Sequence, residues 1–226
     1  MKKRSFVTIL LGVLMLFSAC KKENEAPKFH YEYFGLTKGR FIEYDVVEIR
    51  HDEDLALHDT SYYRLKTVIG DTVIDNSGRI AREFFRYKYD TLQQTYLLQD
   101  LWTAIIDQGR AELVEENQRI IKLVFAPSRF KEWDVNAFNS YPSNYAYYED
   151  IHDPYELNGL SFDSTLMVRQ DSAFNLVEYR QRYEVYAKGV GLIKKHDQEL
   201  RIENFDKKNP LKGQEYFFTI VNFGFE

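Results

Sequence analysis

Apolar and polar residues alternate along much of this chain, which is the spacing that β-strands produce. The alternation is clearest in five stretches, at residues 63–69, 85–89, 121–125, 177–185 and 217–225. Charged residues fill the positions between the apolar ones, including Arg86, Lys88, Lys122, Arg180, Arg182 and Glu184. A period of two with one polar face predicts antiparallel sheet, with the apolar face on a core and the polar face in water.

Short polar segments separate these stretches at the distance expected of hairpins. They are residues 75–78 (Asp-Asn-Ser-Gly), residues 115–118 (Glu-Glu-Asn-Gln) and Lys188-Gly189. These residue types form tight turns. Residues 172–187 also fit helical spacing, but the β-branched Val177 and Val185 favour a strand there. A short helix between Trp133 and Tyr148 is the other helical alternative.

The pattern predicts an all-β fold with little helix. We expect roughly nine to eleven strands in a single antiparallel domain over residues 30–226, too many to remain a flat open sheet. Short consecutive hairpins favour a meander that closes or half-closes into a barrel. A β-sandwich is the alternative.

The N-terminal pattern is different. Three basic residues at positions 2–4 precede an apolar run over residues 6–17, and Ser18, Ala19 and Cys20 follow it. This order is typical of a secretory signal peptide, which we place at residues 1–19. The run of about 12 residues is shorter than the roughly 20 that a membrane-spanning helix needs. Residues 20–29 then form a short charged tether.

Three segments carry a resemblance to a known group. Residues 16–20 (Leu-Phe-Ser-Ala-Cys) resemble the lipobox of bacterial lipoproteins, with Phe17 where Leu or Val is commoner. Residues 34–46 and residues 184–193, which include Gly-Val-Gly-Leu, resemble segments of secreted lipoproteins of Bacteroidota. The resemblance implies that Cys20 carries a diacylglycerol and palmitate-type acyl anchor. It also implies a place in the cell envelope, at the periplasmic or surface face of the outer membrane.

Composition narrows the classes of partner. The formal net charge is −5, and the signal contains only positive charges, so the mature protein is more acidic still. It therefore has no electrostatic attraction to nucleic acid, and we expect none as a partner. Cys20 is the only cysteine. Once it is acylated, no thiol remains for a disulfide or a thiolate metal site.

The best candidate binding site is a group of tyrosines in a loop-like stretch around Pro142 and Asn144. Its members are Tyr141, Tyr145, Tyr147, Tyr148 and Tyr155. Tyrosine has a flat apolar face and a polar tip, which suits sugars, peptides and protein partners. The alternative is that these rings cap one end of the core. Trp102 and Trp133 are expected to be core or rim aromatics.

Two acidic segments contain groups that could ligate a metal. One is residues 51–59, which hold His51 and His58, and the other holds Glu149, Asp150, Asp153 and Glu156. Neither matches a known metal-binding spacing, so we expect a solvated turn at residues 51–59 and no metal or cofactor at either segment. Gly189-Val190-Gly191 lacks the third glycine of a dinucleotide loop and is expected to be a hairpin turn.

The chain contains no nucleophile elbow, zinc-protease or phosphate-loop motif. These observations favour a non-enzymatic envelope module that binds a glycan, an apolar ligand or a protein partner. The N-terminal lipid would anchor this module to the membrane. Two alternatives remain. One is a lipid-anchored hydrolase that uses two carboxylates, and the other is a structural subunit of an envelope assembly.

Overall fold

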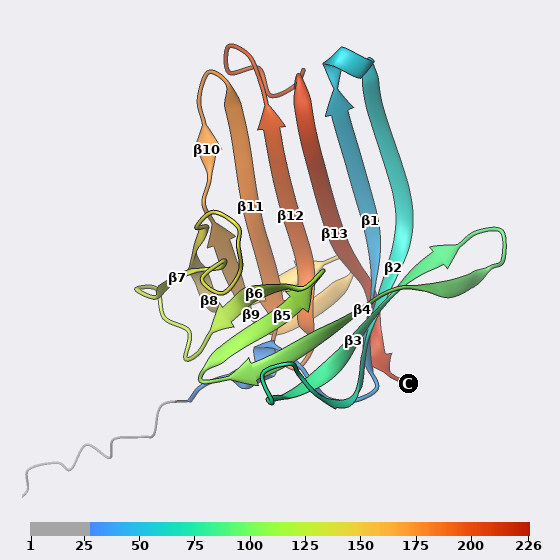
Figure 1. The fold of residues 1–226 in the computed structure, drawn as a ribbon, viewed down its shortest axis with the longest axis vertical. Coiled ribbons are helices and arrows are strands. Elements are labelled where there is room, and N and C mark those ends of the chain that lie inside the picture. The colour runs from blue at the N-terminus through green and yellow to red at the C-terminus, as the bar shows by residue number, and fades with distance from the viewer. Residues whose placement is uncertain (1–27) are drawn as a thin grey trace, which may run out of the picture.

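The structure is a computed structural model that describes residues 28–226, and it is built almost entirely of β-strands (Figure 1). The predicted signal peptide at residues 1–19, Cys20 and most of the tether lie outside the described residues. Two single 3₁₀ turns, η2 (Tyr31–Tyr33) and η3 (Glu53–Leu55), interrupt the strands. Within residues 28–226, no helix is long and apolar enough to cross a bilayer.

Thirteen strands form one antiparallel sheet. They are β1 (Arg40–Asp52), β2 (Leu57–Ile74), β3 (Ile80–Asp90), β4 (Thr95–Asp107), β5 (Arg110–Glu115), β6 (Gln118–Val124), β7 (Glu132–Asp134), β8 (Tyr145–Leu157), β9 (Leu160–Gln170), β10 (Ala173–Phe174), β11 (Glu178–Ala187), β12 (Gly191–Arg201) and β13 (Lys212–Phe225). The order across the sheet is β6-β5-β4-β3-β2-β1-β13-β12-β11-β9-β8-β7, and β10 adds to β11. Most neighbours are consecutive in the chain, and the last strand pairs with the first.

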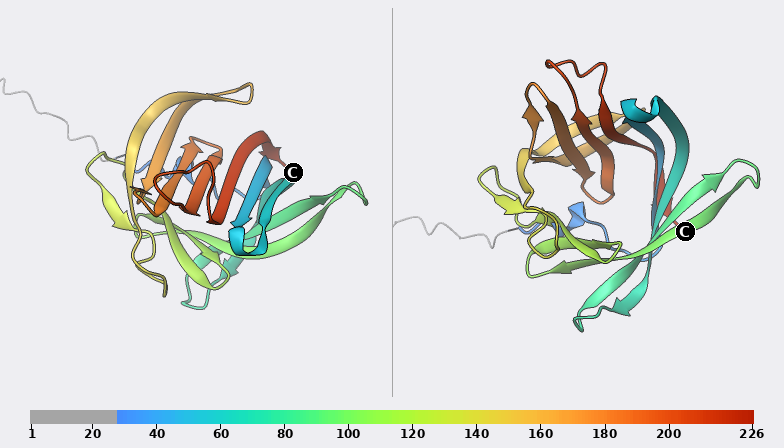
Figure 2. Two further views of the ribbon diagram at one scale, coloured as in Figure 1. Left: turned by 90° about the horizontal axis from the view of Figure 1, so that it is seen from above. Right: turned by 45° about the horizontal axis from the view of Figure 1, so that its top comes forward.

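The sheet curls until its two ends approach each other, so it is a barrel that is nearly closed (Figure 2). The predicted all-β, antiparallel meander barrel is thus confirmed in its half-open form. Thirteen strands occur instead of nine to eleven, because β7 and β10 have only 3 and 2 residues and show no alternation. Residues 178–187 form strand β11, as predicted, and no helix occurs between Trp133 and Tyr148.

Side chains bridge the seam between β6 and the β7–β8 end of the sheet. The Trp133 indole donates to the carbonyl of Ile121 at 3.2 Å. The Tyr148 hydroxyl accepts from the backbone N–H of Val124 at 3.0 Å and donates to its carbonyl at 2.9 Å. A backbone hydrogen bond from the N–H of Ile121 to the carbonyl of Val135 also crosses this seam. These contacts satisfy polar groups of an edge strand that has no full ladder partner.

Tight turns set the register of the hairpins. Glu116 and Asn117 join β5 to β6 with φ angles of 46° and 62°. Positive φ at both central residues is the type I′ geometry that fits the twist of a two-residue hairpin. The turns predicted at residues 75–78, 115–118 and Lys188-Gly189 all lie between strands, as expected.

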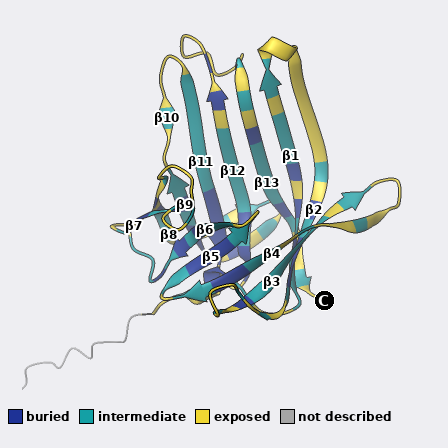
Figure 3. Ribbon diagram, viewed as in Figure 1, coloured by how far each residue is buried: buried dark blue, intermediate teal, exposed yellow. Residues whose placement is uncertain are grey.

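Five strands, β1, β2, β11, β12 and β13, run through two regions of different character (Figure 3). We call their lower parts, together with β3–β9, the barrel section. We call their upper parts the extension, which comprises residues 47–52, 57–62, 178–183, 196–201 and 212–217. Tyr44, Val46 and Leu65 in the barrel section are at most 2% exposed. In the extension strands, only Leu200 and Glu215 are buried.

Candidate functional site

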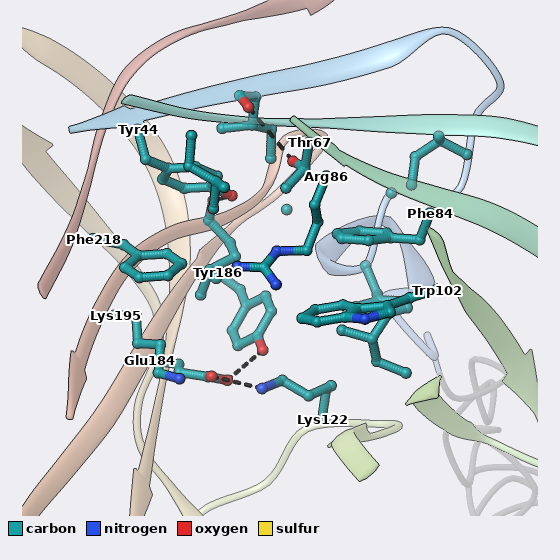
Figure 4. A pocket seen from close by; sticks show the side chains of 18 of the residues that line it. Tyr44, Thr67, Phe84, Arg86, Trp102, Lys122, Glu184, Tyr186, Lys195 and Phe218 are labelled. Atoms are coloured by element: carbon teal, nitrogen blue, oxygen red, sulfur yellow. Dashed lines mark hydrogen bonds and ion pairs between the residues drawn. The ribbon is translucent and has the colours of Figure 1, made fainter. Parts of the chain in front are cut away.

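The barrel section encloses a cavity of about 320 Å³ (Figure 4). Its wall is made by β1–β6, by β11–β13 and by the segment between η2 and β1. Inward positions follow the strand period of two. On β2, for example, the lining residues are Tyr63, Leu65, Thr67 and Ile69. This is the face whose apolar alternation predicted the strand.

The two segments that resemble lipoprotein sequences meet in this wall. Tyr44, from the first segment, donates its hydroxyl to the carbonyl of Leu192, from the second, at 2.8 Å. A Cβ atom on Gly191 would lie 3.3 Å from the Cδ1 atom of Ile42, so glycine leaves room for the end of the Ile42 side chain. Burial raises the pKa of Tyr44 well above its ordinary value, so the phenol stays neutral and donates.

One side of the cavity is aromatic. Phe84 and Trp102 stack with ring centroids 6.3 Å apart. The guanidinium carbon of Arg86 lies 4.1 Å from the Trp102 ring centroid, and Figure 4 shows the Arg86 head pointing into the cavity beside this ring. Arg86 also forms an ion pair with Asp100 at 2.8 Å. A charge placed over an indole and neutralised by a carboxylate is held in a fixed position.

Another part of the cavity wall holds a buried ion pair. Lys122 Nζ lies 2.6 Å from Glu184 Oε1, and the Tyr186 hydroxyl donates to Glu184 Oε2 at 2.5 Å. Glu184 is 3% exposed. Burial alone would raise the pKa of Glu184, but the positive charges of Lys122 and Lys195 outweigh it and leave that pKa below its ordinary value.

The Glu184 carboxylate also shifts the pKa values of its two partners, Lys122 and Tyr186. Burial would lower the pKa of Lys122, but the Glu184 carboxylate reverses this and raises it. Burial, followed by the negative charge of Glu184, raises the pKa of Tyr186. The network therefore has fixed protonation states at neutral pH: a carboxylate, an ammonium and a neutral phenol. It can orient a ligand, but it does not supply an exchangeable proton.

A polar rim lies where the barrel section meets the extension. Asp197 lies 3.4 Å from Lys195 and 3.0 Å from Arg182. The hydroxyls of Tyr63 and Tyr216 donate to the Glu48 carboxylate at 3.4 and 3.2 Å. Burial, together with the nearby Glu48 charge, raises the pKa of Tyr63 to about 12.

These positions correct the prediction that the polar face of each strand faces water. Arg86, Lys122 and Glu184 occupy the polar phase of their strands, yet all three line the cavity. On β3 the inward residues are Phe84 and Arg86, whereas Phe85 was expected to point inward. Alternation identifies the two faces of a strand, but in a barrel with a polar interior it does not show which face is inside.

The predicted tyrosine site is divided by the structure. Tyr145, Tyr147, Tyr148 and Tyr155 belong to strand β8, so only Tyr141 lies in a loop, and the loop assignment was wrong for the other four. Tyr141, Tyr145 and Tyr147 are 53%, 53% and 39% exposed, whereas Tyr148 is 1% exposed and bridges the seam. The Tyr155 hydroxyl accepts from Lys194 at 3.1 Å. Ligand binding by these rings stays a prediction.

The acidic segments form pairs with other side chains. His51 and His58 approach through their Nδ1 atoms at 2.9 Å, and His51 Nε2 lies 2.8 Å from Glu215. Glu149 pairs with Arg169 at 2.5 Å. Among residues 28–226, no group of three or more His, Cys, Asp or Glu side chains is arranged to hold a metal ion. Trp133 is a buried seam residue, and Trp102 is a cavity wall.

Comparisons with known proteins give little guidance. No protein-family model matches this chain, and no curated protein matches it significantly. A solved structure of a candidate lipoprotein from Parabacteroides distasonis ATCC 8503 aligns with 88% of this chain and 100% of its own, at a TM-score of 0.39 and 12% identity. A similarity at this level identifies neither a shared fold nor a shared function.

Proposed function

We propose that this protein is a lipid-anchored envelope protein that binds a small amphipathic ligand inside its barrel section. The observation that carries the proposal is the cavity itself. Its volume of about 320 Å³ lies at the lower end of the range of ligand sites, roughly 300–1,000 Å³. Small barrels either fill their interior with side chains or keep room for one small ligand, and this barrel keeps room.

The wall has the chemistry of such a site. Apolar side chains such as Ile42, Leu65 and Leu113 alternate with a few fixed polar groups. Arg86, Lys122 and Glu184 are each held by a partner, so they present charge at defined positions without needing to rearrange. An apolar lining with few oriented polar groups is typical of pockets that bind organic molecules.

The anchoring part of the proposal comes from the sequence. Cys20 follows an apolar run and a small residue, as a lipidated cysteine does. Phe34, Gly35 and Leu36, which form part of the cavity wall, follow Cys20 in the sequence by 14 to 16 positions. A lipid on Cys20 would therefore place the ligand site close to a membrane, from which apolar ligands can be drawn.

Two carboxylates of the wall, Glu184 and Asp197, do not favour the hydrolase alternative. A glycosidase acid needs a raised pKa, so that it is protonated at working pH. The pKa of Glu184 is instead lowered, and both its oxygens are engaged by Lys122 and Tyr186. Asp197 is paired with Arg182 and Lys195. A binding role uses this arrangement as it stands.

The proposal can be tested with a neutral apolar dye, N-phenyl-1-naphthylamine, whose fluorescence rises in an apolar site. The full chain carrying Cys20→Ala is used, so that no lipid competes for the dye. We expect saturable binding that Leu113→Trp weakens about tenfold or more, because the larger ring fills the cavity. Leu101→Trp is the matched control, since Leu101 lies on β4, is 54% exposed and does not line the cavity.

Circular dichroism and the thermal midpoint show that both tryptophan variants are folded. Equal dye binding by the two folded variants would contradict the proposal. Dye binding that is abolished by changes at Tyr145 and Tyr147 would instead favour the tyrosine site on β8.

A further inference from the structure

Four cationic side chains line the cavity, and one of them differs from the rest. Three have a carboxylate partner: Arg86 with Asp100 at 2.8 Å, Lys122 with Glu184 at 2.6 Å, and Lys195 with Asp197 at 3.4 Å. The fourth is Arg40, at the start of β1. Within residues 28–226, no carboxylate lies within ion-pair distance of Arg40, and its Nε is buried without a hydrogen-bond partner.

Arg40 is nevertheless held in place. It pairs across the sheet with Phe225, and its guanidinium carbon lies 4.5 Å from the centroid of that ring. Gly35 leaves room for the arginine stem, because a Cβ atom there would lie 3.0 Å from Nε. Burial lowers the pKa of Arg40, but an arginine remains charged in proteins. The cavity therefore contains a permanent, positioned positive charge that the described residues do not neutralise.

Arg40 as a whole is partly exposed, but its Nε is buried, and a buried donor without a hydrogen bond is costly unless something compensates it. The guanidinium fork matches a carboxylate or phosphate, to which it donates two parallel hydrogen bonds. The neighbouring wall is apolar, because Ile69, Phe84 and Trp102 follow one another across β2, β3 and β4. The site near Arg40 thus combines a cation for an acidic group with an apolar surface for the rest of a molecule.

We propose that Arg40 binds the acidic group of the ligand, and that the ligand is an apolar acid, such as a long-chain carboxylic acid or alkyl phosphate. This inference rests on the proposed function and specifies its ligand class. Selectivity for the acid over a neutral compound of the same chain length comes from Arg40. The other three cations contribute less, because each already has a carboxylate partner.

The test is displacement of N-phenyl-1-naphthylamine from the full chain carrying Cys20→Ala by three competitors: dodecanoic acid, dodecyl phosphate and dodecanol. We expect one or both acids to displace the dye at concentrations about tenfold or more below dodecanol. Arg40→Gln should remove this preference. It should change the concentration of dodecanol that displaces the dye by about twofold or less. Arg40→Lys, which keeps the charge without the fork, should retain part of the preference.

The matched control is Arg64→Gln, on neighbouring β2. The Arg64 side chain is 55% exposed, pairs with Asp45 at 3.2 Å and does not line the cavity, so the acid preference should persist. The result separates the two proposals. If the dye binds but the acids and dodecanol compete equally, or if Arg40→Gln weakens all three competitors alike, the role of Arg40 is wrong while the binding cavity stands. If the dye does not bind at all, the proposed function fails first.

Should Arg40→Gln lower the thermal midpoint so far that it does not fold, the Arg40→Lys variant decides. Partial loss of acid preference with unchanged dodecanol competition supports the role of Arg40, and full retention of the preference overturns it. A preference for dodecyl phosphate over dodecanoic acid, or the reverse, identifies which acidic group the guanidinium receives.

Discussion

The barrel section and the extension are made by the same five strands, yet they hold together in different ways. In both regions the backbone ladder is continuous, for example where β1 pairs with β13 from Arg40 to Asp52. In the barrel section the inward side chains are buried against the rest of the sheet. In the extension they form cross-strand pairs closer to solvent, such as Lys212 with Asp52 at 3.1 Å. Backbone hydrogen bonding between strands therefore does not by itself bury their side chains. Burial also requires another part of the sheet to pack against that face.

The boundary between the regions falls inside single strands. On β11, residues 178–183 are partly exposed, whereas residues 184–187 are buried. Arg182 pairs with Asp197 and Glu199 near solvent, and two positions later Glu184 pairs with Lys122 in the cavity wall. The same kind of interaction thus occurs at two levels of burial, which allows direct comparison.

The largest expected difference concerns these ion pairs. Lys122→Met leaves the Glu184 charge buried without its partner, and we expect a loss of about 3–5 kcal/mol in the free energy of unfolding. Arg182→Met in the extension should cost about 1 kcal/mol or less, because its pair with Asp197 is only partly buried and solvent screens it. Urea denaturation monitored by circular dichroism measures both. Equal losses in the two variants would contradict the claim that burial makes the Lys122–Glu184 pair more important for stability than the Arg182 pair.

A matched pair of leucines on β2 tests packing without charge. Leu65 is 1% exposed in the barrel section, and Leu57 is 38% exposed at the end of the extension. Leu65→Ala should lower the free energy of unfolding by about 2–5 kcal/mol, the usual cost of a cavity in a core. Leu57→Ala should cost about 0.5 kcal/mol or less. A cost above 2 kcal/mol at Leu57 would show that the extension packs against something further.

The pH dependence of stability should also differ between the regions. Because the folded-state pKa of Glu184 lies below its ordinary value of 4.5, its ionised form stabilises the fold above that pH. This contribution is lost as the pH falls from about 4.5 through the folded-state pKa. Glu184→Gln should therefore be less stable at neutral pH and lose less stability on acidification. Thermal melts of the parent and of Glu184→Gln at pH 3–7 measure the difference, and equal pH slopes would contradict this role of Glu184.

The smallest expected effect concerns metal ions at the extension. His51 and His58 lie together on its strands, but among the described residues no group of three or more possible ligands is arranged to hold a metal ion. Zn²⁺ should therefore leave the thermal midpoint unchanged. An ion bound at 100 times its dissociation constant would stabilise the protein by about 2.7 kcal/mol, which a thermal melt detects. A rise that His58→Ala abolishes would establish a metal site here.

Local patterns in the sequence were enough to predict the strands and turns. The alternation at Tyr63, Leu65 and Ile69 identified the face of β2 that lines the cavity. Glu116-Asn117 identified its hairpin, because these residues accept the positive φ angles of the turn. The segments at residues 34–46 and 184–193 were singled out by resemblance, and both contribute to the cavity wall.

The candidate site required information that local patterns do not contain. Lys122 and Glu184 are 62 positions apart, and nothing near either residue shows that they meet. Each lies at a polar position of a strand with alternating residues. The sequence pattern of such a strand is the same whether its polar face contacts water or a polar cavity. Only the closure of the sheet decides between these outcomes, and closure involves seam contacts such as that between Val124 and Tyr148, which are 24 positions apart.

The central claim is that the barrel section binds a ligand in its interior while the extension does not. Amide chemical shifts measured by NMR during titration with N-phenyl-1-naphthylamine test it most directly. The account predicts saturable shifts at cavity-lining residues such as Ile42, Thr67 and Leu192, and none at residues 49–52 and 212–214 of the extension, which do not line the cavity. Shifts confined to the extension, or to Tyr145 and Tyr147 on β8, would contradict it.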